Sequence, residues 1–465
     1  MAKKGTAPVR VGDRRELEIE GLVGGGEAIA RLDGFPIFVP YAVPGDRIRA
    51  RVISTKPGYA RALIEEVLAP GPLRVQPECP VFSTCGGCQW QALGYADQVE
   101  WKTRLVAEAL QRTGGLDPAG ILKPTLPSPS PWHYRNKVHW AVGKAGGKWL
   151  VGLYEPRSHQ IVDAPTCRIQ GEANNQMLAV VRELLPRFDF EPYDEATGAG
   201  WLRSIFTKTG HGTGEVMLGL VTKNEFFDAG PAFVEAVRAA FPGVTTIVQN
   251  VHPEPGNKLL GRETIALFGP GVIREKIGPL EFSISAEAFF QVNAAAIELL
   301  YGEVAKAAHL ETKPRVLDAY CGTGSIALFL AAQGARDVVG IEIVDKAVED
   351  ARANATRNGL EARFLVGAVE ALLPKVLVAE GAPDVLVLDP PRKGCEPEVL
   401  AAVAKAGAAR VIYVSCNPVT LARDLKLLAP TYVVESVQPV DMFPQTAHVE
   451  CVAVLKKAAP AGTAQ

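Results

Sequence analysis

The stretch Val411-Ile412-Tyr413-Val414-Ser415-Cys416-Asn417-Pro418 runs from four strand-forming residues into a serine, a cysteine and an Asn-Pro turn. This pattern predicts a strand with the Cys416 thiol at its carboxyl end, the edge at which open α/β sheets bind their ligands. A nucleophile is expected there. The alternative is a structural cysteine in the core, because free cysteines are among the most buried residues.

Strand and helix patterns alternate around this stretch from residue 315 onward. Strands are expected at 315–320, 338–343, 362–366, 384–389 and 410–416, with helical segments between them, and then at 432–439 and 448–456 with no helix between. Such a series predicts a doubly wound parallel sheet that ends in an antiparallel pair. We therefore expect a Rossmann-like domain over residues 286–457.

The glycine loop Gly322-Thr-Gly324-Ser-Ile-Ala327 follows the first of these strands and also fits the dinucleotide fingerprint. Asp318, at the end of that strand, would repel a pyrophosphate but attract the cationic groups of S-adenosylmethionine. Glu342 lies about 20 residues further on and can accept hydrogen bonds from a ribose diol in either cofactor. The set favours S-adenosylmethionine over a nicotinamide cofactor.

The atom that accepts the methyl group is indicated by two residues. They are Cys416 and the glutamate of Ala447-His-Val-Glu450-Cys451. Methylation of a pyrimidine carbon needs a thiolate that adds to C6 and a base that removes the C5 proton. Asp389-Pro-Pro-Arg392 lacks the aromatic residue that amino-methylating enzymes place after the prolines. A cytosine-C5 enzyme would carry its cysteine in a Pro-Cys or Thr-Cys context after the fourth or fifth strand, which is not seen. The alternative for Glu450 is a surface glutamate.

The first part of the chain, residues 8–70, has short alternating runs between glycine and proline turns, which is typical of a small β-barrel. Residues 47–64 contain no carboxylate but several cations: Arg47, Arg49, Arg51, Lys56 and Arg61. They form either a solvated strand face or a patch for a nucleic-acid backbone. Because the net charge of the 465 residues is only −2, nucleic acid would have to be bound by a local patch.

The region 75–285 is expected to be a mixed α+β domain, with a helix at 95–113 and a Pro-rich linker at 123–131. Tyr134, Arg135 and Lys137 suit RNA contact, although ordinary strand residues are an equal interpretation. Close cysteine spacing predicts a metal site, completed by one more cysteine downstream; zinc and an iron–sulfur cluster both fit. The ligands would be Cys79, Cys85, Cys88 and Cys167.

No targeting peptide and no apolar run of about 18 residues is present, so a soluble cytoplasmic protein without membrane contact is expected. We expect a monomer. Eight cysteines in 465 residues are too few for a disulfide scaffold and fit a reducing compartment.

The motifs together resemble those of the RNA uracil-C5 methyltransferase family, and most closely its 23S rRNA branch. They are Ser415-Cys416-Asn-Pro, Asp389-Pro-Pro-Arg, Asp318-Ala-Tyr320-Cys-Gly-Thr-Gly324, Phe289-Phe-Gln291-Val-Asn293 and His448-Val-Glu450. The similarity spans nearly the whole chain and implies a TRAM barrel at 8–70, a central domain at 75–285 and a methyltransferase domain at 286–457. It also implies that the helix at 95–113 packs on the methyltransferase domain despite its early position.

The resemblance implies that Cys416 is the nucleophile, that Glu450 is the base, and that the four cysteines hold a [4Fe–4S] cluster. The implied contacts to S-adenosylmethionine are Gln291, Asp318, Tyr320, Gly322, Gly324, Ser325, Glu342 and Asp389. Ala319-Tyr320 departs mildly from the family pattern but keeps the aromatic ring. An RNA substrate is implied, with rRNA preferred to tRNA. An RNA-binding protein without catalysis is the alternative of another class, against which the intact Cys416 and Glu450 argue.

Overall fold

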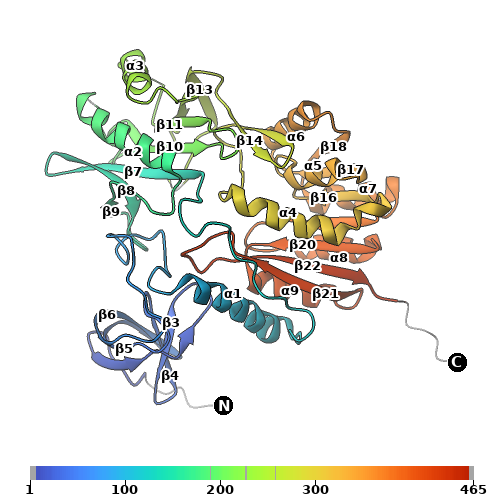
Figure 1. Cartoon of the computed structure of the whole chain (residues 1–465), viewed down its shortest axis with the longest axis horizontal. Coiled ribbons are helices and arrows are strands. Elements are labelled where there is room, and N and C mark those ends of the chain that lie inside the picture. Colours follow the sequence, from blue (N-terminus) through green and yellow to red (C-terminus); the bar gives the residue numbers. More distant parts are fainter. Residues whose placement is uncertain (1–6, 189, 226–227, 257, 460–465) are drawn as a thin grey trace.

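A computed structural model describes residues 7–188, 190–225, 228–256 and 258–459. Figure 1 shows a small barrel at the N-terminal end, a mixed sheet in the middle of the chain and a sheet with flanking helices at the C-terminal end. Residues 1–5, where no targeting peptide is expected, lie outside the described part. Among the described residues no helix is both long and apolar enough to cross a bilayer.

The N-terminal barrel is a sheet with the strand order β1-β5-β6-β4-β3-β2. Its strands are β1 (Arg14–Glu18), β2 (Gly21–Leu22), β3 (Ala28–Leu32), β4 (Phe35–Val39), β5 (Arg47–Lys56) and β6 (Tyr59–Ala69). Alternate residues of β5, such as Ile48 and Val52, are buried in the barrel core. That core also includes Trp90 and Leu105, so the barrel is packed against the segment that follows it.

The central region forms a second sheet, in the order β13-β12-β11-β10-β7-β8-β9, with α2 and α3 packed on it. Its elements are β7 (Lys137–Ala145), β8 (Lys148–Tyr154), β9 (Ile161–Asp163), α2 (Glu172–Leu184), β10 (Leu202–Thr209), β11 (Val216–Thr222), α3 (Gly230–Ala240), β12 (Thr246–Val251) and β13 (Glu263–Phe268). A hairpin of β14 (Ile273–Ile277) and β15 (Leu280–Ile284) follows and shares a hydrophobic cluster with the C-terminal sheet. The expected domain boundary at 285/286 stays a prediction.

The C-terminal sheet has the order β18-β17-β16-β19-β20-β22-β21, and β22 is antiparallel to both of its neighbours. Its strands are β16 (Arg315–Ala319), β17 (Arg336–Glu342), β18 (Ala362–Val366), β19 (Val385–Leu388), β20 (Arg410–Ser415), β21 (Tyr432–Val440) and β22 (Glu450–Lys457). The helices are α4 (Ala294–Ala308), α5 (Ser325–Ala332), α6 (Asp345–Arg357), α7 (Val369–Glu380), α8 (Pro397–Ala406) and α9 (Pro418–Leu428). The predicted multidomain α/β class and doubly wound sheet are confirmed.

The expected helix at 95–113 is found as α1 (Tyr95–Ala109), which continues in a π-helical turn (Leu110–Gly114). Its apolar residues Val106 and Leu110 are buried in one cluster with α9 and the C-terminal sheet. The Pro-rich segment at 123–131 is not a free linker. The Lys123 and Leu126 amides donate to backbone carbonyls of β21, so the segment covers the edge of the sheet.

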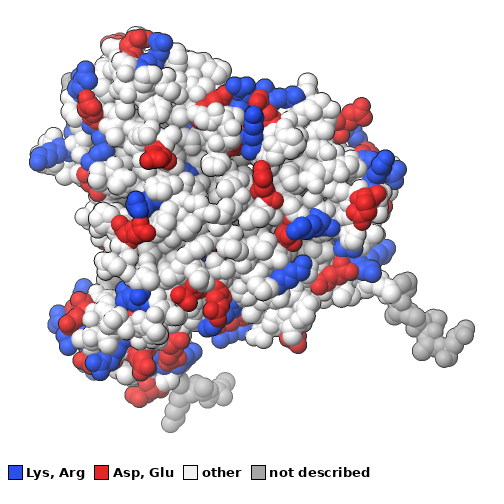
Figure 2. Space-filling view, in the orientation of Figure 1, with Lys and Arg blue, Asp and Glu red and all other residues white. Residues whose placement is uncertain are grey.

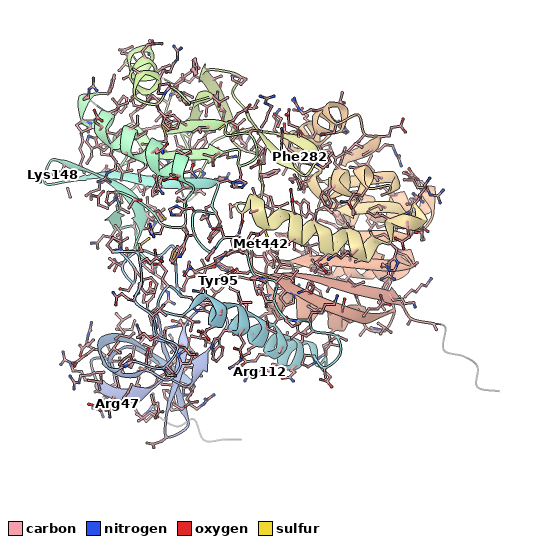
Figure 3. All side chains as sticks on the ribbon, in the orientation of Figure 1. Arg47, Tyr95, Arg112, Lys148, Phe282 and Met442 are labelled. Carbon is pink, nitrogen blue, oxygen red and sulfur yellow. The ribbon has the colours of Figure 1, made fainter. Side chains whose placement is uncertain are left out.

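A buried ion pair joins α1 to the loop between β21 and β22. Lys102 Nζ lies 2.5 Å from Asp441 Oδ1, and both side chains are fully buried. The Tyr95 hydroxyl donates to the other carboxylate oxygen of Asp441 (3.0 Å). Figure 3 shows Tyr95 close to Met442 in the middle of the molecule.

Replacing Lys102 by methionine should lower the free energy of unfolding by about 3–5 kcal/mol, because it leaves the Asp441 carboxylate buried without its counterion. Urea unfolding followed by circular dichroism measures this change. The control is Arg104→Met on the exposed side of α1, whose pair with Glu100 is solvated and should contribute at most about 1 kcal/mol. Equal effects of the two variants would contradict the expectation.

Candidate active site

A cavity of about 870 Å³ opens at the carboxyl ends of the parallel strands in the C-terminal sheet. This size and position are usual for a ligand site in an open α/β sheet. It brings together the predicted residues Gln291, Tyr320, Gly322, Ser325, Glu342, Asp389, Cys416 and Glu450. The loop that carries the first three predicted cluster cysteines also reaches its wall, through Gly86 and Gly87.

Cys416 and Glu450 come together because their strands are neighbours. Strand β20 ends one residue before Cys416, β22 begins at Glu450, and Ser415 pairs with Cys451 in the antiparallel register. The turn after Cys416 is fixed, since the Asn417 side chain accepts from the Val419 amide (3.1 Å) and donates to the Arg392 carbonyl (3.1 Å). Cys416 is half-buried, whereas Glu450 is only 4% exposed.

The acidic groups of the cavity hold their protons unusually tightly. Burial raises the pKa of Glu450 to about 8, and the neighbouring Asp389 contributes to this shift. Burial alone raises the pKa of Asp389 to about 7. Burial, followed by the charge of Glu450, raises the pKa of the Cys416 thiol to about 11, against the influence of Arg392. A cationic ligand would favour the ionised carboxylates, so these groups suit a positively charged cofactor.

The glycine loop shapes the other end of the cavity. Glu342 accepts hydrogen bonds from the Gly322 amide (3.1 Å) and the Val344 amide (2.9 Å). Gly324 has a φ of +79°, and a Cβ there would lie 2.9 Å from the Phe364 ring. Tyr320 also adopts a left-handed φ of +70°, which is strained for a bulky residue and is typical of functional sites.

Asp318 and Gly324 lie behind the cavity wall. The Asp318 carboxylate is fully buried, and its Oδ2 accepts from the Ala327 amide (3.1 Å) in the first turn of α5. Its Oδ1 has no hydrogen-bond partner among the described residues. Asp318 therefore holds the start of α5, and its contact with the cofactor stays a prediction.

Several residues of the cavity were not selected as site residues from the sequence. Tyr301 of α4 reaches the wall, and its hydroxyl is hydrogen-bonded to that of Ser325 (2.7 Å). Its spacing in the helix predicts only a core position. His448 also lines the cavity, and burial lowers its pKa to about 4, so the imidazole is neutral. In the sequence, the His448-Val-Glu450 motif is the feature that could have indicated His448 as a site residue.

The four predicted cluster cysteines surround a second, smaller cavity near β7 and β8. Cys79, Cys85, Cys88 and Cys167 all line it, together with apolar residues such as Trp140 and Leu153. Within the described ranges, no group of three or more His, Cys, Asp or Glu side chains has the arrangement needed for a metal ion. The four cysteines thus share one largely apolar cavity.

The net positive charge around the arginines of β5 is smaller than the sequence of this strand indicates. Arg49 pairs with Glu66 of β6 and Glu16 of β1, and Arg51 pairs with Glu65. Carboxylates absent from residues 47–64 are supplied by the neighbouring strands. Figure 2 accordingly shows blue and red side chains mixed over the barrel, which fits the solvated strand face. Tyr134 is 7% exposed and donates to the Pro444 carbonyl, so it is not available for base stacking.

Three parts of the chain match models of known protein families. Residues 8–64 match the TRAM domain, residues 316–389 a methyltransferase domain, and residues 375–458 the tRNA (Uracil-5-)-methyltransferase family.

Two relatives and one solved structure cover almost the whole length. An RNA methyltransferase of Halalkalibacterium halodurans is 41% identical over 97% of this chain and 99% of its own. One of Listeria monocytogenes is 43% identical over 95% and 97%, respectively. The crystal structure of Pyrococcus abyssi tRNA (uracil-54, C5)-methyltransferase in complex with S-adenosyl-L-homocysteine is 26% identical, with a TM-score of 0.75, and covers 95% of this chain and 100% of its own.

The pKa of Glu450 predicts how stability depends on pH. The folded protein keeps this proton up to about pH 8, whereas an unfolded glutamate loses it near its ordinary pKa of about 4.3. The contribution of Glu450 to stability therefore falls as pH rises between these values. Glu450→Gln should unfold with a free energy at least about 1 kcal/mol higher than the wild type at pH 9, and with little difference at pH 5.

Urea titrations of both proteins at pH 5, 7 and 9 measure this gap. Glu435→Gln on the exposed surface is the control, and its difference from the wild type should not change over this range. A constant gap for Glu450→Gln would show that the carboxyl is already ionised at neutral pH in the folded protein.

Proposed function

The chain belongs to the uracil-5 RNA methyltransferase family with a TRAM domain, and from this premise we propose that it methylates C5 of uridine in RNA through a covalent adduct on Cys416. The observation that carries the proposal is the pair of Cys416 and Glu450 in one cavity with the glycine loop. A thiol and a general base beside a cofactor pocket are what this chemistry requires.

S-adenosylmethionine supplies the electrophilic methyl group. The Cys416 side chain reacts as the thiolate: its Sγ forms a bond to C6 of the uracil, and the electron pair of the C5–C6 double bond moves towards O4 as an enolate. C5 then takes the methyl group, and S-adenosylhomocysteine leaves. Glu450 removes the proton from C5, the double bond re-forms, and the Sγ–C6 bond breaks to restore the thiolate.

The electrostatics support these roles. A pKa of about 8 makes Glu450 a stronger base than an ordinary glutamate once it has ionised. Arg392 opposes the rise in the pKa of both Glu450 and Cys416, because its positive charge favours their ionised forms. Because the C6 atom is covered in stacked RNA, the uridine must be single-stranded or flipped into the cavity.

For the substrate we propose 23S rRNA, with tRNA as the second candidate. The sequence motifs are most similar to the 23S rRNA branch of the family. In favour of tRNA, the solved relative from Pyrococcus abyssi is a tRNA (uracil-54, C5)-methyltransferase.

We further propose that Cys79, Cys85, Cys88 and Cys167 hold a [4Fe–4S] cluster. Their common cavity supports this assignment, since four cysteine thiolates are the ligands of such a cluster. The chemistry at Cys416 needs no redox step, so the cluster would order the loop next to the active-site cavity.

Incubation of the protein with methyl-labelled S-adenosylmethionine and unmodified 23S rRNA or tRNA tests the function. The label should appear in 5-methyluridine. If 23S rRNA is the substrate, the label should appear with rRNA and not with tRNA. Cys416→Ala should lose at least about 10³-fold of the activity, because the unactivated C5 is a poor nucleophile.

Glu450→Gln should also lose turnover but accumulate a protein–RNA adduct that survives denaturing electrophoresis, since elimination needs the base. Cys451→Ala, a neighbouring buried cysteine outside the proposed chemistry, is the matched control. Label in another nucleoside, or an active Cys416→Ala enzyme, would contradict the mechanism through a covalent adduct on Cys416. RNA binding without any transfer would favour the non-catalytic alternative.

Anaerobic purification tests the cluster. The protein should contain about four iron atoms and about four sulfides per chain, with a visible absorbance that is bleached by dithionite. Cys88→Ala should lose the iron, whereas Cys395→Ala, a buried cysteine of the C-terminal domain, should keep it. Stoichiometric zinc without iron would contradict the assignment.

A further inference from the structure

A third cavity, of about 380 Å³, adjoins the active-site cavity on the side of the central sheet. The two cavities share parts of their walls, including Arg135 and Phe289. Phe289 is 70% exposed at this shared rim. The adjoining cavity is therefore open to a ligand that also reaches the active site.

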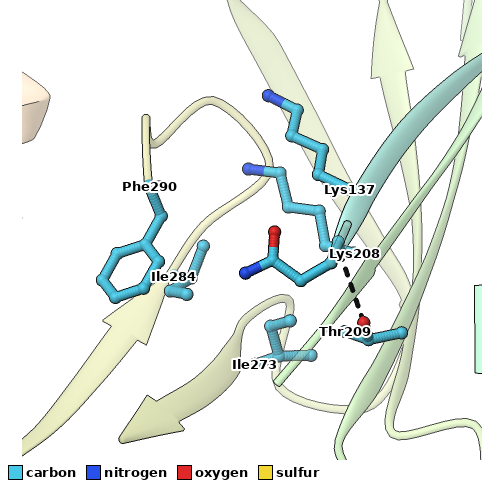
Figure 4. Close-up of a pocket in the computed structure, with 7 residues that line it drawn as sticks. Lys137, Lys208, Thr209, Ile273, Ile284 and Phe290 are labelled. Carbon is cyan, nitrogen blue, oxygen red and sulfur yellow. Dashed lines mark hydrogen bonds between the residues drawn. The ribbon is translucent and has the colours of Figure 1, made fainter. Parts of the chain in front are cut away.

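Lys137 and His139 line this cavity, and Lys137 also lines a small neighbouring pocket together with Lys208. Lys137 of β7 lies directly opposite Lys208 of β10, and His139 lies opposite Phe206, on which its ring stacks at 5.2 Å. Figure 4 shows the two lysine side chains side by side, with both ammonium groups directed towards the loop that carries Phe290. Like charges at directly opposite positions of a sheet destabilise it unless an anion lies between or above them.

The residues that the structure describes place no such anion within ion-pair distance of the two lysines. None of the ion pairs among the described residues involves Arg135, Lys137 or Lys208. Lys208 is 4% exposed, and its Nζ donates to the backbone carbonyls of Ser285 (2.8 Å) and Ala288 (2.9 Å). Burial, followed by the charge of Lys137, lowers the pKa of Lys208 well below its usual value, and Glu287 and Asp350 oppose this shift only from beyond ion-pair distance.

His139 adds unsatisfied hydrogen-bonding groups to the same place. Both ring nitrogens are buried, and neither has a partner among the described residues. Burial and the two lysines lower its pKa to about 3, so the ring is neutral and carries one N–H donor. Burial and the charge of Arg135 likewise lower the pKa of Lys137. A buried donor without a partner is costly, and a bound anion would satisfy it.

We propose that this cavity binds a backbone phosphate of the RNA, next to the nucleotide whose base enters the active site. Lys137 provides the charge and His139 a neutral N–H donor, while Lys208 holds the loop that closes the cavity. This assignment rests on the proposed function, because a flipped uridine must carry its flanking phosphates past the rim shared by the two cavities. Phosphate contacts of this kind position the strand and are insensitive to base sequence.

The test is RNA binding by the full chain with S-adenosylhomocysteine, measured by filter retention over a range of salt concentrations. The probe is the RNA segment that contains the uridine labelled in the methylation assay. Lys137→Gln should weaken binding about tenfold, as expected for one charged hydrogen bond. It should also reduce the slope of log K against log salt by about 0.7, the value for one phosphate of a single strand.

Two further variants isolate the contact. Lys148→Gln removes the same charge at the exposed start of β8, at the far end of the β7–β8 hairpin (Figure 3), and should leave affinity and slope unchanged. His139→Phe keeps a ring against Phe206 but removes the N–H donor, so binding should weaken several-fold with an unchanged slope. Unchanged affinity for S-adenosylhomocysteine verifies that each variant is folded.

A scan with single methylphosphonates identifies the phosphate. One neutral linkage beside the labelled uridine should weaken wild-type binding about tenfold and have no further effect on Lys137→Gln.

Equal binding by Lys137→Gln, Lys148→Gln and the wild type would overturn the phosphate site and leave the methylation proposal intact. Loss of binding in Lys137→Gln without any methyl transfer by the wild type would support the site and overturn the enzyme function. The scan would then cover every phosphate of the RNA that is bound. A wild type that binds no RNA would overturn both proposals.

Discussion

The buried contact of Lys102 with Asp441 is the interaction on which the arrangement of the whole chain depends. It joins a helix of the N-terminal region to the loop before β22, across 339 positions of sequence. Other parts of the chain bind the same loop. The amides of Gln89 and Trp90 donate to the Gln445 carbonyl, and Asn293 donates to the Met442 carbonyl. Because Glu450 follows this loop, the position of the proposed base is set by all of these contacts.

The active-site cavity is a consequence of the same arrangement. Its floor is the edge of the C-terminal sheet, but its other walls come from the cysteine loop, from Arg135 and from the segment around Gln291. Enclosure by these walls withdraws Asp389 and Glu450 from water, and this raises their pKa values. The C-terminal sheet alone would leave these carboxyl groups more exposed and more acidic. The cysteine loop thus contributes to the electrostatics of the site without touching the reacting atoms.

The features that depend on local pattern were predictable from the sequence. The strand that ends at Cys416, the glycine loop after β16 and the antiparallel pair of β21 and β22 follow from short-range periodicity and turn residues. Features that depend on strand register were not. The pairing of Arg49 with Glu66 and the opposition of Lys137 and Lys208 exist only because distant segments become neighbours. The Pro-rich segment was expected as a linker, because proline composition does not reveal that Leu126 pairs with the sheet edge.

The long sequence separation of Lys102 and Asp441 also determines when the protein can finish folding during its synthesis. During synthesis the chain emerges from its N-terminal end, and α1 is exposed long before residue 441 is made. Until then the Lys102 side chain has no buried counterion, and the apolar side of α1, with Val106 and Leu110, has no sheet to cover it. The final assembly of the site is therefore a late, non-local step. A nascent chain cannot modify RNA before its last strand pair has left the ribosome.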